Sequence, residues 1–205
     1  MKYLLIILLF FSCTKDSLVS VENIKEVVLK EEPTSNRSFD NITYYANQHV
    51  SNHGYVTYPM NEWSKTVVFT ESCRYITNDP LNQIDYNKLF GVRKSALYNY
   101  RNGAYLVWAY KPEIDKIRIG WYLHDDDGNF ISMPIAQSIY VNINEPVYLY
   151  LRNYNNTFVY NLDGVTVNIN KSQYDIDNFS NGWRLSPNFG GQETPDNNVT
   201  ITYNN

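Results

Sequence analysis

Hydrophobic and polar residues alternate with a period of two along most of the chain after Ser38. Short runs rich in Val, Ile, Thr and Tyr are separated by turn residues, and no window keeps a helical apolar period for three turns. The pattern predicts strands at Val56–Tyr58, Lys65–Thr70, Tyr105–Tyr110, Lys116–His124, Phe130–Pro134, Ser138–Ile143, Val147–Arg152, Thr157–Leu162, Val165–Ile169, Trp183–Pro187 and Val199–Tyr203. One helical turn is expected at Asn87–Gly91. Strands at this spacing are typical of an all-β, antiparallel sandwich or barrel.

The alternation separates two faces of the middle strands. One face is apolar and is expected to form the core: Ile117, Ile119, Trp121, Leu123, Ile139, Val141, Ile143, Val147, Leu149 and Leu151. The opposite face is expected to be a single outward surface that carries Arg118, Tyr122, His124, Tyr140, Asn142, Tyr148, Tyr150 and Arg152. Two interpretations of this surface stay open. Tyrosines suit any exposed pleated sheet, and they also stack on sugar rings while arginine, histidine and asparagine bind hydroxyls or carboxylates.

Two Asp-Gly segments fall between predicted strands. Asp127-Gly128 ends a run of three aspartates, and Asp163-Gly164 follows Leu162. Because Asp and Gly tolerate positive φ, both segments are interpreted as hairpin turns. A helix-loop-helix calcium site would need a glutamate where the sequence has Ala136. We expect no metal and no cofactor.

The N-terminus predicts an export signal. Residues 1–12, MKYLLIILLFFS, combine a lysine with an apolar run too short to cross a membrane. The following Cys13 resembles the lipidated cysteine of a bacterial lipobox, although an ordinary cleaved signal remains the alternative. We therefore expect a signal peptide at 1–12, a lipidated cysteine and polar tether at 13–38, and one domain at 39–205. The expected location is the outer membrane, lipid-anchored and displayed on the cell surface, with periplasmic display still open.

Composition narrows the class of partner. The chain has a net charge of −4 at pH 7 and no clustered basic segment, which argues against nucleic acid. Its second cysteine, Cys73, has no disulfide partner if Cys13 carries lipid, so the domain depends on its core.

Two segments carry a resemblance. Residues 79–91, DPLNQIDYNKLFG, and residues 184–195, RLSPNFGGQETP, are similar to motifs of a mostly uncharacterised family of bacterial lipoproteins. The resemblance implies a jelly-roll, lectin-like sandwich without an established activity. This chain departs from the family pattern at Asn188, where tyrosine is usual, and at Gln192, where aspartate is usual. The glycines Gly190-Gly191 are expected to be structural, with a ligand loop around Glu193 and Asp196 as the alternative.

No nucleophile elbow, zinc motif or phosphate loop occurs in the sequence. The expected function is a non-catalytic, surface-anchored domain that binds an extracellular glycan, and we assign no catalytic residue. A protein-binding or adhesion module is the first alternative. A polysaccharide lyase is the second, because Arg118, Tyr122 and His124 are residue types that such an enzyme uses.

Overall fold

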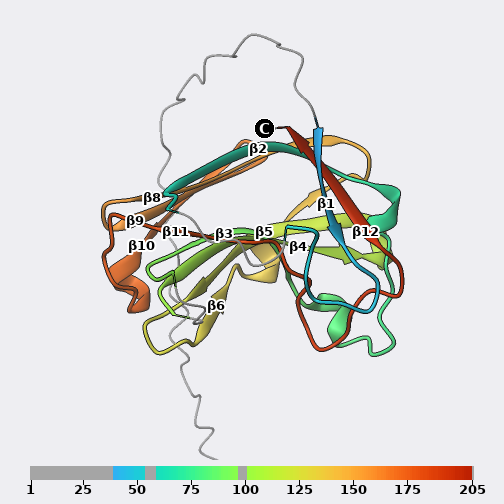
Figure 1. Ribbon diagram of the computed structural model, residues 1–205, viewed down its shortest axis with the longest axis horizontal. Coiled ribbons are helices and arrows are strands. Elements are labelled where there is room, and N and C mark those ends of the chain that lie inside the picture. Colours follow the sequence, from blue (N-terminus) through green and yellow to red (C-terminus); the bar gives the residue numbers. More distant parts are fainter. Residues whose placement is uncertain (1–38, 54–58, 97–100, 205) are drawn as a thin grey trace, which may run out of the picture. The chain divides into compact units, whose positions relative to one another are not determined.

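The protein is a sandwich of two antiparallel β-sheets, as seen in a computed structural model that describes residues 39–53, 59–96 and 101–204. The first sheet contains, in spatial order, β1 (Phe39–Tyr44), β12 (Val199–Asn204), β2 (Glu62–Phe69), β8 (Pro146–Tyr154), β9 (Thr157–Leu162) and β10 (Val165–Asn170). The second contains β11 (Trp183–Leu185), β3 (Asn87–Arg93), β4 (Gly103–Lys111), β5 (Lys116–His124) and β6 (Phe130–Ser132), with β7 (Ile139–Val141) also paired to β5. Figure 1 shows the two sheets as stacked layers. The prediction of an all-β antiparallel sandwich is confirmed.

Five short 3₁₀ helices connect the strands: η1 (Glu71–Cys73), η2 (Asn82–Ile84), η3 (Pro112–Ile114), η4 (Ile135–Gln137) and η5 (Lys171–Tyr174). In the part of the chain that the structure describes, no helix is long and apolar enough to cross a membrane.

The core lies between the two sheets. Of the ten residues predicted for the apolar face of the middle strands, eight are buried, and Ile139 and Ile143 are partly buried against the core. Trp63 of β2 stacks on Phe90 of β3 with ring centroids 4.9 Å apart, which joins the two layers directly. Burial of each large apolar side chain contributes roughly 1.5–3 kcal/mol, so this inner surface accounts for most of the stability of the fold.

Both Asp-Gly segments form hairpin turns, as predicted. Asp163 and Gly164 have φ values of 52° and 88° and connect β9 to β10, the geometry of a type I′ turn. Between β5 and β6, the Asp125 carboxylate accepts a hydrogen bond from the backbone N–H of Asn129, and Gly128 has a φ of 90°.

Two strands were not predicted correctly. Asn87–Gly91 is not a helical turn but the start of β3, which pairs with β4 on one side and β11 on the other. Pairing on both sides overrides the weak local preference of a segment that contains Asn, Lys and Gly. The strand β1 was missed, although Ile42 and Tyr44 alternate into the core. The predicted strand at Val56–Tyr58 and the N-terminal signal, Cys13 and tether lie outside the described residues.

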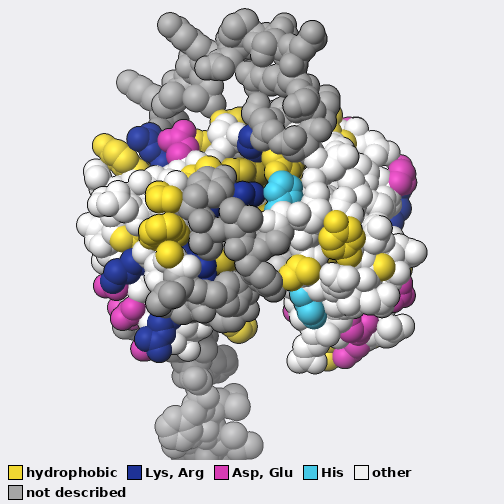
Figure 2. All heavy atoms as spheres, in the orientation of Figure 1, with side chains coloured by type: hydrophobic (Ala, Val, Ile, Leu, Met, Phe, Trp, Pro, Cys, Tyr) yellow, Lys and Arg dark blue, Asp and Glu magenta, His cyan; other side chains and the backbone are white. Residues whose placement is uncertain are grey.

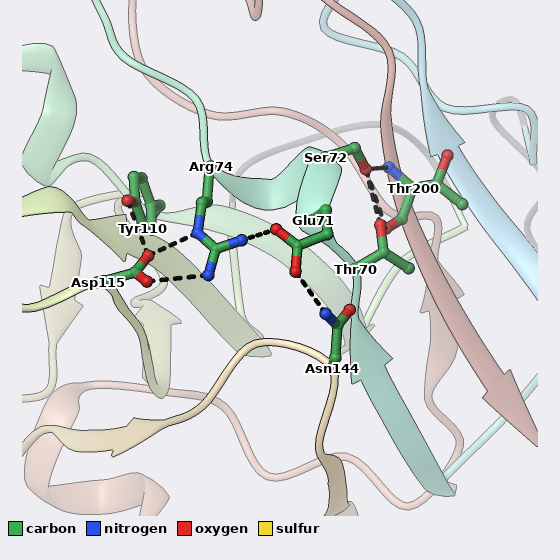
Figure 3. A network of polar contacts seen from close by, with 8 residues as sticks. All are labelled: Thr70, Glu71, Ser72, Arg74, Tyr110, Asp115, Asn144 and Thr200. Carbon is green, nitrogen blue, oxygen red and sulfur yellow. Dashed lines mark hydrogen bonds and ion pairs between the residues drawn. The ribbon is translucent and has the colours of Figure 1, made fainter.

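A polar network joins the segment around η1 to the β4–β5 and β7–β8 connections (Figure 3). Arg74 makes a two-point contact with the Asp115 carboxylate, at 2.6 and 2.9 Å, and also pairs with Glu71. Asn144 donates a hydrogen bond to Glu71, and Tyr110 donates one to Asp115. Ion pairs this exposed are screened by solvent, so the network fixes the local loop geometry more than it stabilises the fold.

A groove on the outward face of the second sheet

The residues predicted to form one surface lie on two. Arg118, Tyr122 and His124 belong to β5, and Tyr140 of β7 is the register partner of Arg118, so these four share the outward face of the second sheet. The other strand residues, Tyr148, Tyr150 and Arg152, belong to β8 in the first sheet. The outward faces of a sandwich point in opposite directions. The single-surface prediction is therefore wrong, because the chain passes to the other sheet between β7 and β8.

Asn142 lies beyond the end of β7, in the turn that leads to β8. Its side chain donates a hydrogen bond to the Glu145 carboxylate at 2.9 Å, within the same exposed turn. It therefore belongs to neither sheet face.

The outward face of β5 is also less open than alternation predicts. Arg118 is 2% exposed and His124 is 4% exposed. A loop after η2 covers Arg118: its Nη2 donates to the Ile84 carbonyl at 2.5 Å, and its guanidinium lies 4.2 Å from the centre of the Tyr86 ring. The covering loop comes from a distant part of the sequence, and for this reason the strand pattern alone did not reveal it.

A groove of about 370 Å³ runs along this face. Its floor is formed by Lys88 of β3, Val107 of β4, and Arg118 and Tyr122 of β5. The walls come from the loop at 84–86, from β6 and the segment that follows it, and from Gly190 and Gly191. Grooves of this size with a few convergent polar groups are the usual form of a ligand site.

Strand register explains why polar groups converge there. Lys88, Val107 and Gly120 form one row across β3, β4 and β5, and Arg118 and Tyr122 flank Gly120 along β5. Val107 is short and Gly120 has no side chain, so Tyr86 and Met133 can approach the sheet closely at this row. A Cβ placed on Gly120 would lie 3.2 Å from the Tyr86 hydroxyl. The hydroxyl of Tyr86 therefore sits directly over this row.

The charges of the groove are predominantly positive. Burial lowers the pKa of Lys88 to about 8, and its Nζ lies 4.9 Å from the ring centre of Tyr105 and 5.4 Å from that of Tyr122. Burial also raises the pKa of Asp85, although the neighbouring Arg118 partly opposes this shift. The Nε of Arg118 has no hydrogen-bond partner in the described structure. A carboxylate ligand would complement the predominantly positive charge of the groove.

One rim of the groove is aromatic and apolar. The Phe130 ring stacks on the Tyr122 ring at 5.8 Å with an interplanar angle of 7°, and Phe130 is 70% exposed. Ile84 and Ile135, which also line the groove, are 44% and 62% exposed. An exposed aromatic surface next to polar groups suits the apolar face of a sugar ring.

The two motif segments form one wall of the groove. Lys88 and Asn188 are joined by two backbone hydrogen bonds, and the N–H of Gly190 donates to the Asn87 side chain at 2.8 Å. A Cβ on Gly190 would lie 2.0 Å from the Tyr86 carbonyl oxygen, so only glycine fits this contact. The structural interpretation of the glycine pair is thus correct, but the same contact positions Tyr86 in the groove.

The loop-rim residues have other surroundings. Glu193 accepts hydrogen bonds from the backbone N–H groups of Asn78 and Asp79, both at 2.7 Å, and from the Asn82 side chain at 2.8 Å. These bonds hold the pKa of Glu193 below its usual range and brace the loop before η2. Asp196 is exposed. Neither residue lines the groove.

The groove does not contain the carboxylate pair that a glycoside hydrolase uses. Asp85 is the one carboxylate among its described lining residues. Within the described ranges, no group of three His, Cys, Asp or Glu side chains could hold a metal ion. His49 and His53, four residues apart, instead contact the Phe189 carbonyl and the Tyr203 hydroxyl respectively.

Charged side chains of both signs lie on the face of the molecule displayed in Figure 2. Figure 2 shows basic and acidic groups interspersed around the periphery of the face it displays, with hydrophobic side chains scattered between them.

The fold is similar to that of enzymes that act on polysaccharides. The alginate lyase AlyC3 matches with a TM-score of 0.51 and 8% identity over 80% of this chain and 71% of its own. The alginate lyase from Klebsiella pneumoniae gives 0.49 and 12%, covering 71% of this chain and 58% of that enzyme. A Bacteroides ovatus family 16 endo-glucanase gives 0.43 and 10%, over 84% and 81%. At these identities the likeness concerns the jelly-roll fold alone. No family model and no curated protein matches the sequence.

Proposed function

We propose that this protein binds a carboxylate-bearing polysaccharide in the groove on the outward face of the second sheet. The observation that carries the proposal is the pairing of a buried cationic floor, formed by Lys88 and Arg118, with the exposed aromatic rim formed by Tyr122 and Phe130. A uronate brings a negative charge with each sugar unit, which complements Lys88 and Arg118, whereas a neutral glycan brings none.

Each part of the groove has a separate task in this proposal. Arg118 is held rigidly by the Ile84 carbonyl and the Tyr86 ring, so it binds a carboxylate without first losing side-chain freedom. Its planar guanidinium favours a two-point contact with that group. Phe130 and Tyr122 offer ring faces to the neighbouring sugar. The solved complex of AlyC3 with dimannuronate supports the proposal, since a protein of similar fold holds an acidic sugar.

The proposed cellular setting comes from the sequence. We place the domain on the bacterial cell surface, attached to the outer membrane through acylated Cys13, as a member of the lipoprotein family whose motifs it resembles. Several acyl chains anchor a protein stably. We would express the protein in a bacterial host and measure two things: the loss of residues 1–12 on export, and the labelling of Cys13 by a fatty acid analogue. A Cys13→Ser variant that remains membrane-bound would contradict this part of the proposal.

Binding is tested with the purified full-length chain by calorimetry against polymannuronate, polygalacturonate and a neutral β-glucan. We expect saturable binding to an acidic chain and none to the neutral one. Arg118→Gln is expected to weaken binding by about 10- to 100-fold, because a charged hydrogen bond contributes roughly 1.5–3 kcal/mol. Arg152→Gln, an exposed arginine on the opposite face, is the matched control. Equal binding to neutral and acidic glycans, or equal loss in both variants, would contradict the proposal.

A further inference from the structure

We infer that the groove also cleaves its acidic glycan by β-elimination, with Lys88 as the group that removes the proton and Tyr86 as the group that returns one. This inference rests on the proposed function, because it requires a uronate held by Arg118. It goes beyond the expectation of a non-catalytic domain, and it uses two residues that the sequence pattern did not single out.

Geometry brings the required groups to one place. Lys88 and Gly120 lie in the same row of the second sheet, Arg118 is two residues from Gly120 along β5, and the Tyr86 hydroxyl lies over Gly120. The side chains of Lys88, Arg118 and Tyr86 all line the groove. A uronate whose carboxylate binds Arg118 would therefore lie in the groove that Lys88 and Tyr86 also line.

Arg118 and Lys88 differ in their ability to release a proton. The guanidinium of Arg118 stays charged at all relevant pH values and can only neutralise the carboxylate, which makes the adjacent carbon–hydrogen bond more acidic. The amine of Lys88 can release its proton, because burial lowers its pKa to about 8. At pH 7 roughly a tenth of the molecules then carry a neutral amine at this position. A neutral amine is a base of suitable strength for proton abstraction.

The reaction balances without a further reactant. The Lys88 nitrogen takes the proton from C5 of the uronate, and the electron pair of that C–H bond forms the C4–C5 double bond. The C4–O bond to the leaving sugar breaks, and the leaving oxygen takes the proton of the Tyr86 hydroxyl. The products are an unsaturated uronate and a shortened chain. Proton transfer from the Lys88 ammonium to the Tyr86 phenolate restores both groups.

The aromatic groups beside Lys88 have a separate role. Tyr105 and Tyr122 place their rings near its ammonium, so they stabilise the charged form that proton abstraction creates. The titratable or charged groups around Lys88 that belong to the same face are Asp85, Tyr86, Tyr105, Arg118, Tyr122 and His124.

The test measures binding and cleavage separately on the full-length chain. Cleavage of polymannuronate, polyguluronate and polygalacturonate is followed by the ultraviolet absorbance of the new double bond, and binding by calorimetry. Lys88→Arg retains the positive charge but cannot act as a base, so we expect cleavage to fall about 100-fold or more while binding changes by less than about threefold. Tyr86→Phe keeps the ring on Arg118 and is expected to lose cleavage to a similar extent. Tyr148→Phe, on the first sheet, is the matched control.

The pH profile distinguishes a base from a structural residue. Because the neutral amine is the active form, the rate should rise as pH increases and level off above about pH 8, and this step should be absent in Lys88→Arg. Binding of an acidic chain without any cleavage would overturn this inference and leave the proposed function intact. Absence of binding would overturn both. Undiminished cleavage by Lys88→Arg or Tyr86→Phe would show that the residues are wrongly assigned.

Discussion

The two outward faces of this sandwich are built from similar residues and have different surroundings. On the second sheet, Arg118 is buried beneath the Ile84–Tyr86 loop and lines a groove. On the first sheet, Arg152 is exposed, pairs with Glu62 at 3.4 Å and lies over the Tyr154 ring at 4.7 Å. The comparison teaches that residue type and alternation do not define a site. The difference between the faces is the loop at 84–86, which covers Arg118 on the second sheet, whereas Arg152 on the first sheet is exposed.

The covering loop depends on Gly190, and its substitution should have the largest effect. In Gly190→Ala the new Cβ would meet the Tyr86 carbonyl, a backbone atom that cannot move without disturbing β3. We expect a loss of roughly 2–4 kcal/mol in the free energy of unfolding, together with weaker glycan binding. Urea denaturation and calorimetry would measure the two effects.

Gly164→Ala is the control on the first sheet. Its Cβ would meet no atom within 4 Å, but its φ of 88° is unfavourable for alanine. A cost of about 1–2 kcal/mol with unchanged binding is expected. Should the two glycine variants be equally stable and bind equally well, the structural importance assigned to the Tyr86 contact would be incorrect.

The aromatic rim offers a second way to compare the faces. Phe130→Ala removes a ring that is 70% exposed and stacked on Tyr122, so glycan binding should weaken by about tenfold, which corresponds to roughly 1.4 kcal/mol. Tyr154→Ala removes a ring that is 52% exposed on the first sheet and should leave binding unchanged. Titration of both variants with the same oligosaccharide would reveal whether the two rings differ.

Proton binding to Lys88 should make the affinity of the groove depend on pH. Its positive charge, present below about pH 8, is lost as pH rises through that value, so binding of an acidic glycan should weaken several-fold between pH 7 and pH 9. The Lys88→Arg variant stays charged and should show a flat profile over this range. A parallel decline in both proteins would attribute the effect to some other group.

The smallest effect is expected from the first-sheet tyrosines. Tyr148 forms one exposed hydrogen bond with Ser64, at 2.9 Å, and Tyr150 is only partly buried. The double variant Tyr148→Ala/Tyr150→Ala should change the free energy of unfolding by about 1 kcal/mol or less and leave glycan binding as it is. A marked loss of glycan binding would restore this face as a recognition surface, and normal glycan binding with loss of a protein partner would favour the adhesion alternative.

Much of the fold could be predicted from sequence, since alternation and turn chemistry are local. The bounds of β5 and β9 and the turn at Asp163-Gly164 match the prediction. The site could not be predicted in the same way, because it depends on contacts between distant segments. Lys88 was assigned to a helical turn, and Tyr86 was only part of a motif. The sequence did contain one indication of the site. The two motif segments, 79–91 and 184–195, contact each other and form a wall of the groove.

Hydrogen exchange of the full-length chain with and without an acidic oligosaccharide tests the central claim most directly, because it locates the ligand on one of the two faces. We predict slower exchange in 84–91, 118–124 and 130–135, which surround the groove, and no change in 148–154 of the first sheet. Protection of 148–154 without protection around Lys88 and Arg118 would contradict the account.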